Sequence, residues 1–87
     1  MRNIKSQITN LMNLPKEIAL DLPLVMATGR GEITIENYKN LIEFTETKIR
    51  ILTKEGILEV LGERLRLKQI TTENIVVAGR VSNITYS

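Results

Sequence analysis

Residues 48–68, KIRILTKEGILEVLGERLRLK, carry the pattern that decides the fold. Apolar and polar residues alternate along 48–52 and 57–61, as they do on a strand that buries one face. The segment 53–56 ends on a glycine and predicts a turn, and Gly62-Glu63 has the form of a two-residue hairpin turn. The stretch therefore predicts three short strands joined by two tight turns.

These two turns also predict a register, in which apolar residues oppose apolar residues and opposite charges meet. Such pairs favour a register by a few tenths to about 1 kcal/mol each, and a slip by one residue would turn every apolar side chain to the wrong face. The predicted pairs are Ile49–Val60, Arg50–Glu59 and Ile51–Leu58 across the first turn, and Val60–Leu65, Glu59–Arg66 and Leu58–Leu67 across the second.

The same alternation continues outside this stretch. It predicts strands at 24–28, 32–36, 41–45, 75–78 and 81–86, with turns at 29–31, 37–40, 46–47 and 79–80. A hairpin at 37–40 would set Ile42 opposite Ile35 and Phe44 opposite Ile33, with Phe44 in the core. The next turn would set Phe44 opposite Ile49 and Glu43 opposite Arg50. The outer face would then carry one row of Thr34, Glu43, Arg50, Glu59 and Arg66.

The fold class that follows is all-β. Seven to eight short strands form an antiparallel meander, which must close as a small barrel or fold over as a sandwich to cover its apolar face. A β-solenoid stays open as an alternative, although the chain shows no fixed repeat. The early strand after Pro23 and the last strand should both lie at sheet edges that can accept an added strand. Proline at Thr85 is predicted to disrupt assembly through the last strand.

The N-terminal residues have helical rather than strand spacing. Ile4, Ile8, Leu11 and Met12 predict a short amphipathic helix over 3–13, and Pro15 can open a further helical turn. We expect one β domain over 1–87, with 1–22 as a helical lead-in and 23–87 as the meander. The helix is expected to pack on the domain core, and a contact with a partner or a membrane surface stays open.

The composition argues against catalysis and metal binding. The chain has no histidine and no cysteine, which removes the commonest general base and metal ligand and all thiol chemistry. Asp21 is the single aspartate, and the serines have no nucleophile-elbow context. We therefore predict a protein that is not an enzyme, and the sequence indicates no catalytic, cofactor-binding or metal-binding residue and no cofactor.

Binding of single-stranded nucleic acid is the alternative function for a small β-barrel. Such surfaces combine positive charge with aromatic stacking platforms. The net charge is only +2, and the aromatic residues are Tyr38, Phe44 and Tyr86. The basic segment 64–68 is the one cationic strand, and we expect it to be a solvated face. Nucleic acid is therefore the less favoured partner.

No apolar run approaches the roughly 18 residues of a membrane span. The first residues also lack the 7–15-residue apolar core of a signal peptide. The expected location is the cytoplasm, with a membrane reached through a partner.

Several short motifs occur together in the chain: LPKEI at 14–18, LDLP at 20–23, Gly29, ITIEN at 33–37 and the spaced glycines of the second half. Together they resemble the YabP/YqfC family of sporulation proteins, and its YqfC branch most closely. The resemblance covers about residues 12–86. It implies a small protein of endospore-forming bacteria, made in the mother cell and needed for spore envelope or cortex formation. It also implies a membrane-anchored, YqfD-like sporulation protein as partner, a peripheral location at the forespore membrane, and no catalytic residues. Together with the strand edges, it predicts an interaction module that docks on that partner or on copies of itself.

Overall fold

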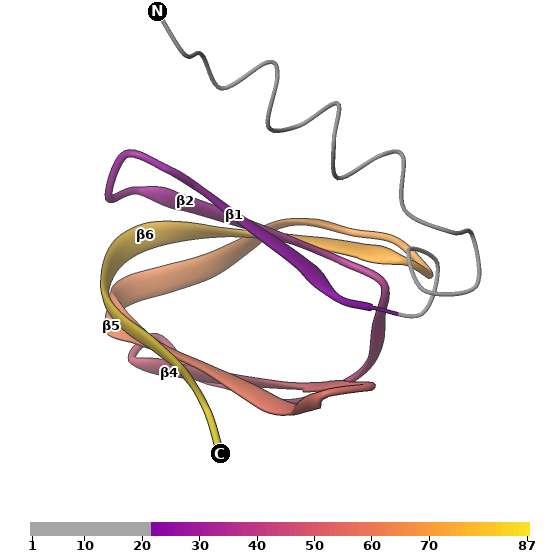
Figure 1. The fold of residues 1–87 in the computed structure, drawn as a ribbon. Helices are drawn as coiled ribbons and strands as arrows, with labels where there is room; N and C mark the ends of the chain where they lie inside the picture. The colour runs from indigo at the N-terminus through magenta and orange to yellow at the C-terminus, as the bar shows by residue number, and fades with distance from the viewer. Residues whose placement is uncertain (1–21) are drawn as a thin grey trace, which may run out of the picture.

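The computed structural model describes residues 22–87, and these residues form six strands in one antiparallel sheet (Figure 1). The order in the sheet is β1-β2-β6-β5-β4-β3, so β3 to β6 form a meander and the β1–β2 hairpin adds beside β6. The strands are β1 (Leu24–Thr28), β2 (Glu32–Glu36), β3 (Tyr38–Phe44), β4 (Lys48–Thr53), β5 (Gly56–Ile70) and β6 (Asn74–Tyr86).

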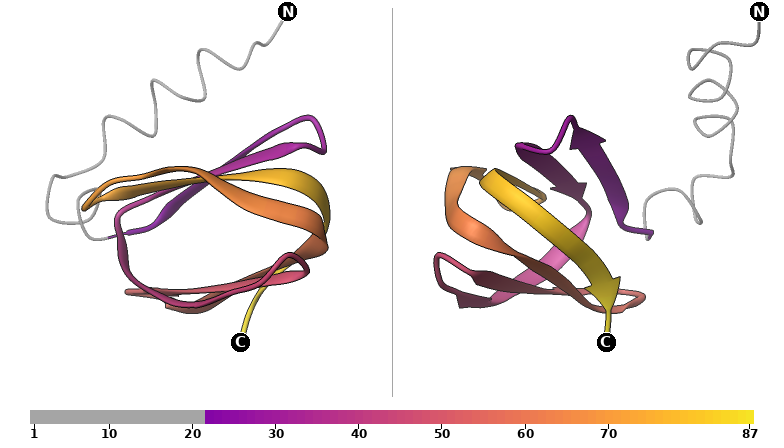
Figure 2. Two further views of the ribbon diagram at one scale, coloured as in Figure 1. Left: turned by 180° about the vertical axis from the view of Figure 1, so that it is seen from behind. Right: turned by 90° about the vertical axis from the view of Figure 1, so that its left-hand side faces the viewer.

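The connection from β2 to β3 forces this sheet to fold over. In a flat sheet the two strands would lie about 19 Å apart, because four inter-strand spacings of about 4.8 Å separate them. Asn37 alone joins them, and two peptide units span at most about 7 Å. The sheet must therefore curl until β2 and β3 meet at one end. Figure 2 shows the result as two facing layers.

The two long strands pass from one layer into the other. Residues 74–78 of β6 pair with β2, whereas 81–86 pair only with β5 among the described strands. Likewise, 56–61 of β5 pair with β4, and 66–70 pair only with β6. The first layer therefore contains β1, β2 and the paired segments 74–78 and 66–70. The second layer contains β3, β4 and the segments 56–61 and 81–86.

Bulges and glycines bend β5 and β6 between the layers. Three register shifts interrupt their pairing, and each extra residue bends the strand that carries it. A Cβ atom on Gly62 would lie 2.0 Å from the Arg80 carbonyl oxygen, and one on Gly79 would lie 2.6 Å from that of Arg64. Two turns are also bonded to this bend: the Val81 N–H donates to Arg30 O, and the Leu65 N–H donates to Glu46 O.

The core lies between the layers and is built from aliphatic side chains. Each of them has at most 2% of its surface exposed, and burial of each stabilises the fold by about 1.5–3 kcal/mol. One layer contributes Ile33, Ile35, Ile75 and Val77, the other contributes Ile49, Ile51, Leu58 and Val60, and Leu65 lies at the bend of β5 between them.

Several predictions are confirmed, beginning with the all-β fold class. The turn at 53–56 has the predicted register, with Ile49 opposite Val60 and Arg50 opposite Glu59. Glu43 also lies opposite Arg50, and Phe44 opposite Ile49. The Arg50 side chain lies 3.8 Å from a carboxylate oxygen of Glu43 and 3.8 Å from one of Glu59.

The predicted hairpins at 62–63 and 79–80 are wrong, because both segments lie inside long strands. The six described strands replace the seven to eight that were expected. Gly62 pairs with Val81 rather than turning the chain, and Arg66 pairs with Ala78 rather than with Glu59. The glycines at these places allow close crossing of two backbones. Alternation alone does not distinguish that role from a turn.

The predicted hairpin between β2 and β3 is also wrong. β2 pairs with β1 and β6, so Ile35 lies opposite Val25 and Ile75 and not opposite Ile42. Residues 38–40 belong to β3, and the chain turns at Asn37 alone, which has a positive φ of 64°. Phe44 is 44% exposed at the outer edge of the sheet rather than buried. The outer row is therefore limited to Glu43, Arg50 and Glu59, because Thr34 lies in the other layer.

The sheet folds over but does not close into a barrel, since β1 and β3 are not paired with each other. The helix predicted over 3–13 and the helical turn after Pro15 lie outside the described residues.

Candidate interaction surface

The fold leaves four strand edges that no described strand covers. They are β1, β3, residues 66–70 of β5 and residues 81–86 of β6. Proteins protect exposed edges with charges and bulges, because regular uncharged edges accept further strands. The four edges therefore differ in how readily they can accept a further strand, according to their charges and bulges.

Two of the edges carry such protection. β3 contains Lys39 and Glu43, and two register shifts disturb its pairing with β4. The 66–70 segment contains Arg66 and Lys68, with a register shift between Leu67 and Gln69. The Lys68 Nζ also lies 2.6 Å from Glu32 Oε2. Strand addition at these edges would meet charged side chains and an irregular backbone.

The other two edges are unprotected. β1, with the sequence LVMAT, has no charged residue, and its register with β2 is continuous from Leu24 to Thr28. Residues 81–86 of β6, VSNITY, have no charged residue either. Their one register shift with β5 lies at Ser82, and the pairing is continuous from Asn83 to Tyr86. Both match the edges that the sequence predicts as available, namely the strand after Pro23 and the terminal strand.

The alternation of hydrogen-bonded and non-hydrogen-bonded pairs identifies the backbone groups that point outward from β6. The Ser87 N–H donates to Ile57 O at 2.8 Å. Because bonded pairs alternate along an antiparallel ladder, Thr85 also faces β5, and Ile84 and Tyr86 face away from it. The N–H and C=O groups of Ile84 and Tyr86 are therefore directed to the open side. Thr85 is the wrong place for a proline test of this edge, since its N–H belongs to the ladder with β5.

The same argument applies to β1. The Gly79 N–H donates to Gly31 O at 3.1 Å, and the Asn37 N–H donates to Glu73 O at 2.8 Å. The odd-numbered residues of β2 therefore face β6 and its even-numbered residues face β1. It follows that the backbone groups of Val25 and Ala27 point away from β2.

These two unprotected edges border one groove of about 300 Å³, which we call the edge groove. Its apolar lining comes from both layers, and Arg30 is its one charged residue among the described part of the chain. The principal lining residues are Ala27, Arg30, Ile33, Val81, Ser82 and Ile84.

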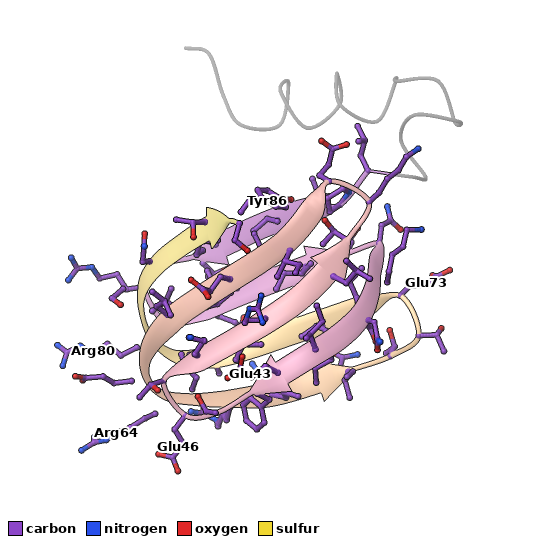
Figure 3. All side chains as sticks on the ribbon, turned by 90° about the horizontal axis from the view of Figure 1, so that it is seen from below. Glu43, Glu46, Arg64, Glu73, Arg80 and Tyr86 are labelled. Carbon is purple, nitrogen blue, oxygen red and sulfur yellow. The ribbon has the colours of Figure 1, made fainter. Side chains whose placement is uncertain are left out.

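A second, larger groove of about 870 Å³ continues from the first across the bend and shares Arg30, Val81 and Ser82 with it. Glu63 and Arg80 also line this second groove. Arg64 and Arg80 extend into solvent from this end of the molecule, near Glu46 (Figure 3). The mixed charges are exposed, and no ion pair within 4.0 Å joins these side chains.

The side chains considered from the sequence are dispersed over the fold. The basic segment 64–68 is split between the bend and the outer face, where Lys68 is paired with Glu32. The Tyr38 hydroxyl donates to Thr71 O, and this bond joins β3 to the turn between β5 and β6. Phe44 and Tyr86 are about half exposed, but β4 and β5 separate their strands. The aromatic residues do not form one stacking platform. Within residues 22–87, no three potential metal-ligating side chains gather at one place.

Sequence comparison gives this fold a family. The family model described as "YabP family" matches residues 23–87. The chain belongs to the YabP family. It is also similar to the uncharacterized protein YqfC of Bacillus subtilis (strain 168), with 30% identity over 83 residues, which cover 95% of this chain and 89% of that protein. The resemblance drawn from the motifs, including that to the YqfC branch, is therefore confirmed.

In this YabP family protein, residues 22–87 contain no helix with the length and apolar character needed to cross a bilayer. The edge groove itself was not predicted from the sequence. Two uncharged strands, 24–28 and 81–86, were the signal that could have indicated it. The two strands meet at one groove because β6 bends at 79–80. The sequence predicts a turn at this place.

Proposed function

We propose that this YabP family protein is a non-catalytic interaction module that acts in spore envelope or cortex formation. It docks on a membrane-anchored, YqfD-like sporulation partner at the forespore, from the mother-cell side. The observation that carries the proposal is a pair of uncharged strand edges whose register is continuous, β1 and residues 83–86 of β6. Membership in the YabP family supports the proposed role in sporulation.

Strand edges suit docking for a physical reason. An added strand gains main-chain hydrogen bonds without a preformed side-chain site, while neighbouring pockets select its side chains. Two of the four open edges in residues 22–87 are protected by both charges and bulges. β1 has neither, and residues 81–86 of β6 have no charge and a single bulge at Ser82. A protein selected only to remain monomeric would be expected to protect them all.

The residues that line the two grooves fit a non-catalytic role. The lining of both grooves is made of small, apolar and cationic residues with one carboxylate, Glu63. That set supplies no paired acid and base at hydrogen-bond distance, which general acid–base chemistry would require. Recognition by backbone and apolar contacts needs no such pair.

The proposal is tested by imaging a fluorescent fusion of the full chain in its native host through growth and sporulation. The expected result is a signal confined to sporulating mother cells, which forms a ring at the forespore surface and becomes diffuse when the membrane partner is deleted. A signal over the nucleoid during growth would instead favour nucleic-acid binding. A diffuse signal at every stage would contradict docking at the forespore.

A further inference from the structure

We propose that the edge groove receives an extended segment of a partner protein, which adds to residues 81–86 of β6 as a further strand. The segment has alternating apolar residues and carries an acidic side chain at the Arg30 end. This inference rests on the proposed function, because it names the site at which the interaction module binds its partner. It assigns a partner chemistry to one edge of the sheet.

The backbone of β6 supplies the hydrogen bonds. Ile84 and Tyr86 face away from β5, as the bond from the Ser87 N–H to Ile57 O shows. An incoming strand finds their N–H and C=O groups directed toward it, in a segment without charged side chains. β2 does not compete for this edge, because its pairing with β6 ends at Ala78.

The groove lining determines the side-chain pattern of the added segment. Ile84 pairs with Val60 and therefore lies on the core face, as does Ala27, which pairs with Ile33. Successive residues of a strand point to opposite faces. Every second residue of the incoming segment would therefore contact these apolar side chains and should itself be apolar. The residues between them would face solvent, beside Asn83 and Thr85.

Arg30 determines the charge of the partner and argues against a second copy of this chain. It lies at the turn bonded to Val81, and Arg80 lines the adjoining groove. A carboxylate on the added segment can pair with either guanidinium. The uncharged edge strands of this chain, 24–28 and 81–86, would bring no carboxylate to Arg30. A different protein with an acidic residue fits the groove better.

Random heptapeptides displayed on phage and selected on the full 87-residue chain test this pattern. We expect the enriched peptides to alternate apolar and polar residues and to carry Asp or Glu near one end. The most enriched peptide, made synthetically, should shift the backbone amide signals of Ala27, Ile84 and Tyr86 in nuclear magnetic resonance spectra. Failure to enrich any such peptide, or shifts centred on β3, would overturn the proposal.

The backbone contribution is tested with Ile84→Pro, which removes an N–H that β5 does not use. Binding of the selected peptide, followed by fluorescence polarisation, should weaken at least tenfold while circular dichroism stays that of the parent. Ile84→Ala is the control for the lost side chain and should weaken binding much less. Tyr86→Pro, closer to the chain end, replaces Ile84→Pro if that variant does not fold. Undiminished binding by the folded proline variant would contradict strand addition.

The charge contribution is tested with Arg30→Glu, and Lys39→Glu is the control with the same change in net charge on the β3 edge. Arg30→Glu should weaken binding of the acidic peptide at least fivefold, and a peptide with Lys in place of the acidic residue should recover it. Lys39→Glu should leave binding within twofold. Equal effects of the two variants would show that the charge preference is nonspecific and would overturn the Arg30 assignment.

Two measurements separate this inference from the proposed function. In the fusion protein, Ile84→Pro should abolish the forespore ring. A ring that persists in this variant would contradict docking at the edge groove but would leave the proposed docking at the forespore intact. Conversely, a fusion that never forms a ring would contradict the proposed function without bearing on peptide binding in vitro. Sedimentation of the parent chain as a dimer that Ile84→Pro dissociates would assign the edge to a second copy instead.

Discussion

At the scale of single residues, the bend depends on positions where two backbones approach each other closely. Gly62 lies opposite Val81, and its Cα faces the Arg80 carbonyl at a distance that leaves no room for a methyl group. Gly31 lies beside the same bend, but a Cβ atom there would be 3.7 Å from Gly79 O, an ordinary contact. A methyl group therefore fits at Gly31 and not at Gly62, which makes the two positions a matched pair for substitution by alanine.

We expect Gly62→Ala to lower the free energy of unfolding by at least about 2 kcal/mol, since the crossing strands must separate to admit the methyl group. Gly31→Ala should change it by less than about 1 kcal/mol. Urea denaturation monitored by circular dichroism measures both. Similar values for the two variants would show that the strands do not cross this closely.

Asn37 is the second residue with a special role, because it alone connects the two layers between β2 and β3. Its φ of 64° is in the left-handed region, and its side-chain Nδ2 donates to Leu22 O at 3.0 Å. Asparagine tolerates this backbone conformation better than most residues with a side chain.

Asn37→Ala should destabilise the protein by about 2 kcal/mol, from a left-handed alanine and a lost hydrogen bond. Asn37→Gly loses the side-chain bond but not the backbone freedom, so it should retain about 1 kcal/mol more stability than Asn37→Ala. Thermal and urea unfolding of both variants test the difference. A glycine variant less stable than the alanine variant would contradict the backbone argument.

At the scale of elements, the β3–β4–β5 layer combines a buried aliphatic face with an outer row of charges. Arg50 lies between Glu43 and Glu59, 3.8 Å from each, on the central strand of the three. These side chains are partly exposed, with 31% of Arg50 and 41% of Glu43 accessible to solvent. Solvent therefore screens the two pairs, and the inner face supplies most of the stability.

We expect Arg50→Ala to lower the free energy of unfolding by no more than about 1 kcal/mol, and the loss should shrink in 1 M salt. Ile51→Ala, the neighbouring change on the buried face, should cost about 2–5 kcal/mol at any salt concentration. Urea titrations at low and high salt compare them. A loss for Arg50→Ala that exceeds the loss for Ile51→Ala would reverse this ranking of the two faces.

At the scale of the whole molecule, the topology adds one pairing between distant strands, β2–β6, to four pairings of consecutive strands. Ile33 of β2 lies opposite Val77 of β6, and the chain between them includes three of the four strands of the other layer, namely β3, β4 and residues 56–61 of β5. The long-range loop must close before the β2–β6 pairing can contribute stability.

The protein should accordingly fold in milliseconds to seconds, as other all-β domains with non-local pairing do. Stopped-flow refolding from urea, monitored by tyrosine fluorescence, measures the rate. Variants of the β2–β6 pair, such as Ile33→Val, should mainly accelerate unfolding if this pairing forms late. Refolding within microseconds would show that the long-range pairs are not rate-limiting.

The sequence by itself determined the fold class, the family and the pairings of β4 with β3 and β5. Alternation and a glycine turn specified the β4–β5 hairpin and the Glu43–Arg50–Glu59 row, because residues close in sequence meet with little freedom of register. The motifs at 14–37 are sufficient to indicate the family. The uncharged character of 24–28 and 81–86 was equally visible in the sequence.

Only the tertiary structure decided how the strands are ordered and where the open edges lie. The sequence around Gly62 and Gly79 would look the same for a chain that turns there and for two long strands that cross. Which of the two forms depends on the close approach of Gly62 to Arg80 and of Gly79 to Arg64, residues that lie well apart in the sequence. The placement of β2 beside β6 likewise follows from packing of Ile33 and Ile35 against Ile75 and Val77, more than 35 residues away in the chain. The edge groove arises from that packing, because it exists only once β6 bends away from β2 and leaves residues 81–86 uncovered.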